Sequence, residues 1–153
     1  MDLKQAHYLA LELMSKHGIT QTGWNFKFDN TNRRFGVCKY YSKIIGLSKK
    51  LTLINDEARV KDVILHEIAH ALTPGHGHDH IWRKKAIEIG STGERCYTET
   101  NTNTPESRYI GTCPKGHIHK RHKATSKIYS CNKCSLKFNK EYIITWKLNP
   151  EYN

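Results

Sequence analysis

The stretch that decides the fold runs from His66 to Trp82 and reads HEIAHALTPGHGHDHIW. Its first five residues, His66-Glu67-Ile68-Ala69-His70, form the pattern H-E-x-x-H. Residues four apart lie on one face of a helix, so both imidazoles can bind one zinc ion, with ring nitrogens about 2.0–2.1 Å from the metal. Glu67 then lies where it can take a proton from a water molecule that zinc activates. The pattern predicts a catalytic zinc site of the metalloprotease type.

The residues around the pattern place it on a helix. Apolar side chains recur there at helical spacing and mark one buried face: Val60, Val63, Ile64, Ile68 and Leu72. Asn55 or Asp56 can cap the start of this helix, and residues 73–75, Thr-Pro-Gly, can end it.

A catalytic zinc ion usually has three protein ligands, so a third must come from outside this helix. The turn that follows offers His76, His78 and His80. Asp79 lies among them and can orient a ligand imidazole through a hydrogen bond. We favour another interpretation, in which Asp79 caps a further helix over residues 81–89 or lies in solvent.

The chain before this stretch predicts a helix and then strands. Apolar residues recur at helical spacing over residues 2–16, which predicts a helix, and Gly18 can end this helix. Trp24, Phe26 and Phe28 alternate with polar residues, as in a strand with one buried face, and we expect them in the core. Residues 33–41 and 44–54 predict two more strands. The result is an α+β domain with a small sheet.

Composition narrows the functional classes. The chain has 153 residues, 25 Lys plus Arg against 14 Asp plus Glu, and a net charge of +11, which favours an anionic partner. It contains no run of about 18 uncharged apolar residues, so we expect no membrane contact. Asp2, Lys4 and Glu12 interrupt the apolar N-terminus, which does not resemble a signal peptide. We therefore expect a protein that is cytoplasmic or nucleoid-associated and not secreted.

The C-terminal part carries a second set of metal-binding residue types. Cys113 and His117 are followed by the pair Cys131 and Cys134, and a Cys3His set can form a closed, structural zinc site. His119 or His122 can replace His117 as the fourth ligand. Few large apolar residues surround these positions, and structural zinc contributes about 10–16 kcal/mol of folding free energy in small domains. We expect one catalytic and one structural zinc ion.

Two cysteines, Cys38 and Cys96, are left over. We expect ordinary thiols that are buried or partly buried, with Cys96 as an alternative zinc ligand.

The same C-terminal part is strongly basic. Residues 107–140 contain nine Lys or Arg and no acidic side chain. The cations best placed between the two ligand pairs to contact phosphates are Lys120, Arg121, Lys123 and Lys127. Aromatic residues lie among them and can stack on unpaired bases: Tyr109, Tyr129 and Phe138. Nucleic acid is the partner that this pattern predicts.

The stretch from His66 to Trp82 resembles the active-site segment of SprT-like (Spartan-type) zinc metallopeptidases. That segment has H-E-x-x-H, a short loop, Gly-His, and an aromatic residue four positions after that His. Gly77-His78 with Trp82 fits this register. The resemblance therefore implies His78 as the third ligand, ahead of His76 and then His80.

The similarity extends over most of the chain, through the strands upstream and a zinc ribbon downstream. It implies a zincin-like domain over residues 1–92, with an N-terminal helix, a small antiparallel sheet and the H-E-x-x-H helix. The polar composition of residues 93–106, rich in Thr and Asn, indicates a linker, and a basic zinc ribbon over residues 107–153 follows. The commoner ribbon has four cysteines, so His117 is a departure.

The resemblance implies a zinc-dependent endopeptidase that cleaves DNA-bound or DNA-crosslinked proteins, with single-stranded or damaged DNA as partner. Glu67 then serves as general base and as proton donor to the leaving amine. The alternative is a non-catalytic, zinc-containing adapter or regulator that binds nucleic acid.

Overall fold

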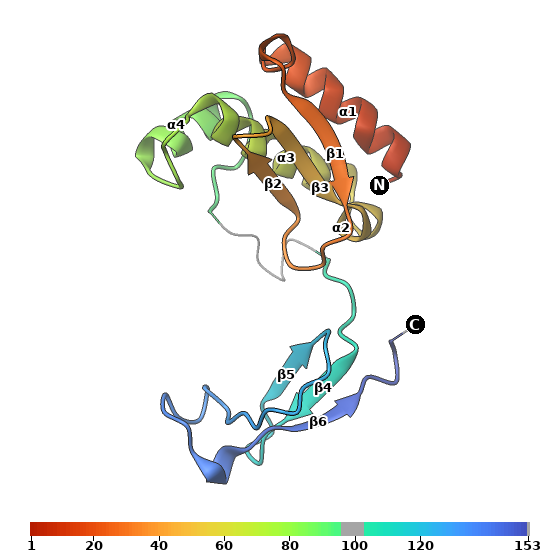
Figure 1. Ribbon diagram of the computed structural model, residues 1–153, viewed down its shortest axis with the longest axis vertical. Helices are drawn as coiled ribbons and strands as arrows, with labels where there is room; N and C mark the ends of the chain where they lie inside the picture. The colour runs from red at the N-terminus through yellow and green to blue at the C-terminus, as the bar shows by residue number, and fades with distance from the viewer. Residues whose placement is uncertain (96–102, 153) are drawn as a thin grey trace. The chain divides into compact units, whose positions relative to one another are not determined.

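A computed structural model describes residues 1–95 and 103–152 of the chain. The chain divides into two units, Met1–Pro105 and Glu106–Asn153, and each is described by itself (Figure 1). Cys96 lies outside the described residues. None of the described helices has the length and apolar character that crossing a bilayer requires.

The first unit begins with helix α1, Leu3–Lys16, whose N-terminus is capped by the carboxylate of Asp2. Its apolar face packs against helix α3 and strand β1. The single turn η1, Thr20–Thr22, leads into the sheet. Trp24 and Phe26 are buried in the core that these elements share, as predicted, and Phe28 packs against it.

The sheet of this unit contains β1, Asn25–Asp29, β2, Gly36–Lys39, and β3, Ile44–Ser48, in the order β1-β3-β2. Strand β2 is antiparallel to β3, but β1 and β3 are parallel. The predicted antiparallel sheet is therefore wrong in one of its two pairings. The reason is burial: four of the five residues of β3 are buried, so β3 takes the central place and β2 the edge. Strand β1 therefore pairs with β3 and not with β2, and β1 and β3 run in the same direction.

The predicted strand over residues 44–54 is also too long. It ends at Ser48, and helix α2, Lys49–Ile54, follows. The Ser48 hydroxyl accepts a hydrogen bond from the Leu51 amide at 3.3 Å and so caps the new helix. Apolar residues in a short run fit either structure, and this cap favours the helix.

Two helices complete the first unit. Helix α3, Glu57–Leu72, is capped by Asp56 and is buried from Asp62 to Ala69. Helix α4, His80–Glu88, is capped by Asp79, whose Oδ1 accepts the amides of Ile81 and Trp82 at 3.0 Å. The capping interpretation of Asp79 is confirmed.

The second unit is a small antiparallel sheet with very little core. Strand β4, Tyr109–Thr112, lies between β5, Ile118–Arg121, and β6, Thr145–Leu148, and the turn η2, Lys140–Tyr142, precedes β6. Its buried hydrophobic cluster consists of Cys113, Cys131 and Ile144, against which partly buried residues pack. Thus two of these three residues are candidate zinc ligands.

Candidate active site and metal centres

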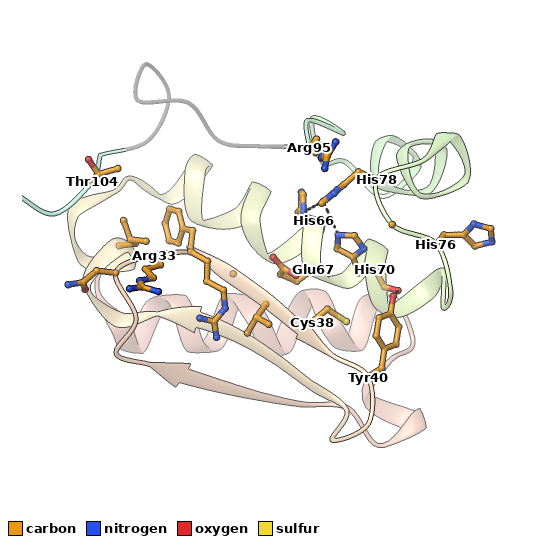
Figure 2. Close-up of a pocket in the computed structure, with 17 residues that line it drawn as sticks. Arg33, Cys38, Tyr40, His66, Glu67, His70, His76, His78, Arg95 and Thr104 are labelled. Atoms are coloured by element: carbon orange, nitrogen blue, oxygen red, sulfur yellow. Dashed lines mark hydrogen bonds between the residues drawn. The ribbon is translucent and has the colours of Figure 1, made fainter. Parts of the chain in front are cut away.

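Three histidines converge in the first unit (Figure 2). His66 and His70 come from α3, and His78 comes from the turn before α4. The Nε2 atom of His78 lies 3.1 Å from Nε2 of His66 and 3.1 Å from Nε2 of His70. Tetrahedral zinc with bonds of about 2.0–2.1 Å holds two ligand nitrogens about 3.3–3.4 Å apart. The cluster therefore fits a zinc ion.

The other two histidines of the turn lie elsewhere. His76 points away from the cluster, and its Nδ1 lies 2.8 Å from Oδ2 of Asp79 (Figure 2). His80 is the exposed first residue of α4. The structure thus places with His66 and His70 the histidine that was ranked first, His78.

The protonation states of the cluster suit metal binding. Burial, with smaller contributions from His70 and His78, lowers the pKa of His66 to about 3. Burial and the neighbouring His78 lower the pKa of His70 to about 4. Both imidazoles are therefore neutral at neutral pH, which is the form that binds a metal.

Trp82 forms a wall shared by all three imidazoles. Its side chain is 1% exposed. The ring stacks on His70 at 5.0 Å and contacts the rings of His66 and His78 edge-on, at 4.7 and 4.6 Å between centroids. Sequence reasoning used Trp82 as a marker of register but missed this contact. The sequence pointed to Trp82 only through its position, four residues after His78.

Glu67 is buried beside the cluster, and strand β2 leaves room for it at a glycine. A Cβ atom added to Gly36 would lie 2.5 Å from Oε1 and 2.7 Å from Cγ of Glu67. Burial raises the pKa of Glu67 to about 8, although the Arg34 guanidinium opposes the shift. A pKa near neutrality suits a group that takes a proton and then returns it.

A cavity of about 660 Å³ opens in front of these residues (Figure 2). Besides Glu67 and the histidines, its walls include apolar side chains and the cationic residues Arg33, Arg34 and Arg95. Tyr40 also lines it and donates its hydroxyl to the carbonyl of His70. Neither Tyr40 nor the arginines belong to a motif, so sequence reasoning missed them.

Cys38 lies in the wall of the same cavity and is partly buried, as expected. Burial, helped by the nearby charge of Glu67, raises its pKa to about 12. The thiol is therefore protonated at neutral pH and is a poor nucleophile.

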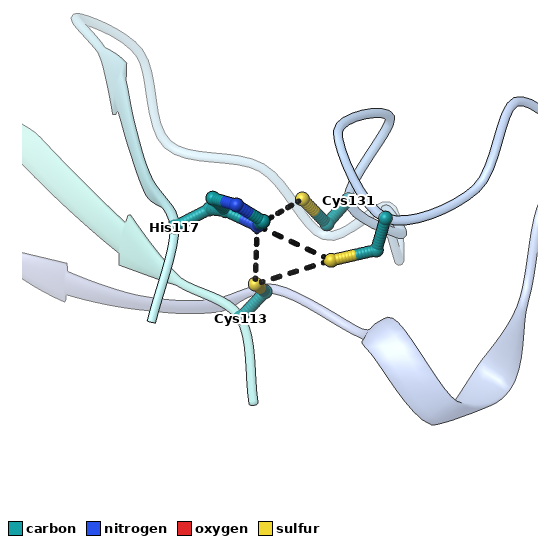
Figure 3. Close-up of side chains that lie close together, drawn as sticks. Cys113, His117 and Cys131 are labelled. Carbon is teal, nitrogen blue, oxygen red and sulfur yellow. Dashed lines mark hydrogen bonds between the residues drawn. The ribbon is translucent and has the colours of Figure 1, made fainter. Parts of the chain in front are cut away.

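The second unit brings together Cys113, His117, Cys131 and Cys134, with ligand atoms within 4.8 Å of one another (Figure 3). Nδ1 of His117 lies 3.2 Å from Sγ of Cys134 and 3.6 Å from the other two sulfurs. The Cys113 and Cys134 sulfurs are 3.8 Å apart, the distance that two zinc–sulfur bonds of about 2.3 Å give in a tetrahedron. This set therefore fits a closed zinc site.

The two alternative histidines of the second unit differ in position. His119 places Nε2 3.2 Å from the Cys131 sulfur alone, so it is placed to donate a hydrogen bond to that sulfur. His122 is exposed. His117 is thus the histidine that the structure places within reach of all three thiols.

Two basic side chains of this unit, Lys120 and Arg121, line a smaller cavity. Lys120, Lys123 and Lys127 are exposed. The Arg121 guanidinium lies over the rings of Tyr129 and Trp146, at 5.3 and 5.0 Å from their centroids. These three residues line a cavity of about 460 Å³, together with Lys120 and four others. Trp146 was not among the aromatic residues that the sequence singled out, because it lies outside the basic run.

Comparison with known proteins agrees with this geometry. The model of the SprT-like family matches residues 5–109, more than half of the chain, so the chain belongs to the SprT-like family. No curated protein matches it.

Among solved structures, the metallopeptidase zymogen jannalysin of Methanocaldococcus jannaschii is similar, with a TM-score of 0.50 and 19% sequence identity. The match covers 61% of this chain and 86% of jannalysin. The zincin-like α+β fold is thereby confirmed. Family and site together support a zinc metallopeptidase.

Proposed function

We propose that this chain is a zinc-dependent endopeptidase that cleaves DNA-bound or DNA-crosslinked proteins. The observation that carries the proposal is the convergence of His66, His70 and His78 beside the buried carboxyl group of Glu67, at the wall of an open cavity.

The chain's own residues divide the work of peptide hydrolysis. When bound, zinc supplies Lewis-acid polarisation of water and of the scissile carbonyl. The three histidines hold it, and Glu67 takes the proton of the attacking water and then gives it to the leaving amine.

The edge of the sheet supports cleavage within a chain. Strand β2 lies at the edge, and among the described residues no strand pairs with its outer side. An extended peptide can add to this edge through backbone hydrogen bonds, which need no chain terminus. It then passes Gly36, against which the Glu67 side chain packs.

The second unit supports the DNA partner. Exposed lysines can neutralise phosphates without reading sequence. The cavity of Arg121, Tyr129 and Trp146 offers aromatic rings and a guanidinium to an unpaired base. Single-stranded DNA is the form that exposes such bases.

The test of this function incubates the full chain with a disordered basic protein, with and without single-stranded DNA. We expect fragments that increase with DNA and disappear with a chelator. The matched control is Glu67→Gln, which keeps the three histidines. Cleavage that survives in Glu67→Gln would overturn the mechanism, and DNA binding without any cleavage would favour the adapter instead.

The DNA contact has its own matched pair of variants. Tyr129→Leu removes an aromatic ring of the cavity, whereas Phe138→Leu removes an exposed ring outside it. A stacked base is worth about 1–3 kcal/mol, so we expect Tyr129→Leu to weaken single-stranded DNA binding by roughly 5- to 150-fold. Equal binding by the two variants would exclude this cavity as the base site.

A further inference from the structure

We infer that buried Asp62, through the segment formed by residues 91–94, fixes the tautomer and ring orientation of His66. Asp62 is thus a positioning residue for the metal site. The inference rests on the proposal that the three histidines bind zinc, and it assigns a task to a carboxylate that the hydrolytic mechanism does not use.

Asp62 lies on α3, one helical turn before His66, and is 9% exposed. Its Oδ1 accepts hydrogen bonds from the Ser91 hydroxyl and the Thr92 amide, both at 2.8 Å. Its Oδ2 accepts the Thr92 hydroxyl at 3.1 Å and the Arg59 guanidinium at 3.0 Å. A carboxylate with four donors holds its partners firmly when its bonds are buried or partly buried, because competition from water is then reduced.

The same segment is held from the side of α4. The Ser91 amide donates to the carbonyl of Ala86 at 2.8 Å. Gly93 follows with a φ of +69°, and a Cβ there would lie 2.9 Å from Cγ1 of Ile87. A side chain at this position is disfavoured both by the left-handed backbone and by the contact. The backbone from Ser91 to Glu94 is therefore held in one conformation.

This path ends at the metal site. The ring of His66 hydrogen bonds to the backbone of Glu94, and because metal binding needs the lone pair of Nε2, the Glu94 carbonyl is the acceptor. Nε2 of His66 faces the cluster, which leaves Nδ1 as the donor. A proton held on Nδ1 leaves the lone pair on Nε2 for the metal.

His70 provides an internal comparison. Its ring bonds to the backbone of His76, in the turn before α4, and not to the segment that Asp62 holds. Loosening residues 91–94 should therefore change His66 and leave His70 as it is. A general loss of stability would affect both rings.

The experiment measures both rings directly. Long-range proton–nitrogen NMR of the metal-free full chain reports the tautomer of each histidine. We expect His66 to carry its proton on Nδ1 in the wild type and to populate both tautomers in Asp62→Asn, with His70 unchanged. Ser91→Ala is the second variant, because it removes the hydroxyl that donates to Asp62 and accepts from the Gly93 amide, without altering the buried charge.

Zinc affinity supplies the second readout, by competition with chelators of graded strength. Loss of a residue that orients a ligand typically costs 10–100-fold in metal affinity, and we expect this loss at the three-histidine site, with the cysteine site as control. Thr52→Val is the matched variant, because it removes a buried hydrogen bond to the Ser48 carbonyl at the start of helix α2, outside the segment.

A single Nδ1 tautomer of His66 in both Asp62→Asn and Ser91→Ala overturns the inference, and zinc affinity equal to that of Thr52→Val would agree with that result. The proposed function fails separately, if the wild-type chain binds no zinc through the histidines. The tautomer measurement needs no metal and decides the inference in either case.

Discussion

The two units of this chain hold their candidate metal sites in opposite ways. In Met1–Pro105 a core of sixteen buried residues from helices and sheet surrounds the elements that carry the histidines. In Glu106–Asn153 the buried cluster is Cys113, Cys131 and Ile144, so the ligands themselves are most of the core.

This difference assigns different tasks to the two sites. In the first unit a packed core of helices and sheet can hold three histidines and a buried carboxyl group in place, as a reactive site requires. In the second unit, where little apolar surface is buried, we expect a bound metal to supply much of the folding free energy. The comparison predicts which unit responds to each change.

Metal removal should give the largest difference. Structural zinc contributes about 10–16 kcal/mol of folding free energy in small domains, so chelation should unfold the second unit and leave the first folded. Proton–nitrogen NMR of the chelated full chain checks this, because signals of residues 106–152 should collapse while those of residues 1–95 stay dispersed. A second unit that stays folded without metal would contradict the claim that the two units differ in how far their folding depends on metal.

Trp82→Ala should give the next largest effect, and only in the first unit. Replacement of a buried Trp by Ala typically costs about 3–5 kcal/mol, and this ring also supports all three imidazoles. Denaturant titration should show the loss of stability in the first unit, with the second unit unchanged as the internal control. Trp82→Phe keeps most of the buried surface and should lose much less.

The stability of the metal-free first unit should depend on pH through Glu67. Burial raises its pKa from 4.5 to about 8, so the folded state keeps a proton that the unfolded state has lost. This contribution is complete below pH 4.5 and is lost as pH rises through 8, by up to ~1.4 kcal/mol per pH unit.

Glu67→Gln has no such proton to lose. Its stability relative to wild type should therefore increase between about pH 5 and pH 8 in urea titrations with a chelator present. A difference that does not change with pH would show that Glu67 is ionised in the folded, metal-free unit.

Gly36→Ala should give the smallest of these changes in free energy. The added Cβ meets Glu67 and Val63 within 2.8 Å, so Glu67 must shift. A displaced catalytic group of this kind costs up to about 100-fold in rate. Peptide cleavage should fall while zinc content is unchanged. Gly77→Ala is the control, since it lines the same cavity with nothing within 4 Å of the added atom, and it should retain activity.

Local patterns predicted the three longer helices well, and the sheet and the short helix α2 less well. The caps at Asp56 and Asp79 and the helical spacing through α3 depend on neighbours in sequence, which a reader of the sequence can see. The parallel pairing of β1 with β3 depends on which strand is buried most, and the early end of β3 depends on the Ser48 cap. Both are settled by contacts and burial that periodicity does not show.

The sequence by itself determined the chemistry of this protein: the H-E-x-x-H helix, the Cys and His set of the second unit, and the uneven positive charge. These follow from spacing along one helix or one turn and from composition. Only the tertiary structure decided that His78 meets His66 and His70, that Trp82 supports them, that Gly36 makes room for Glu67, and that Asp62 reaches residues 91–94. Each of these contacts joins separate segments, and their meeting depends on how the whole core packs.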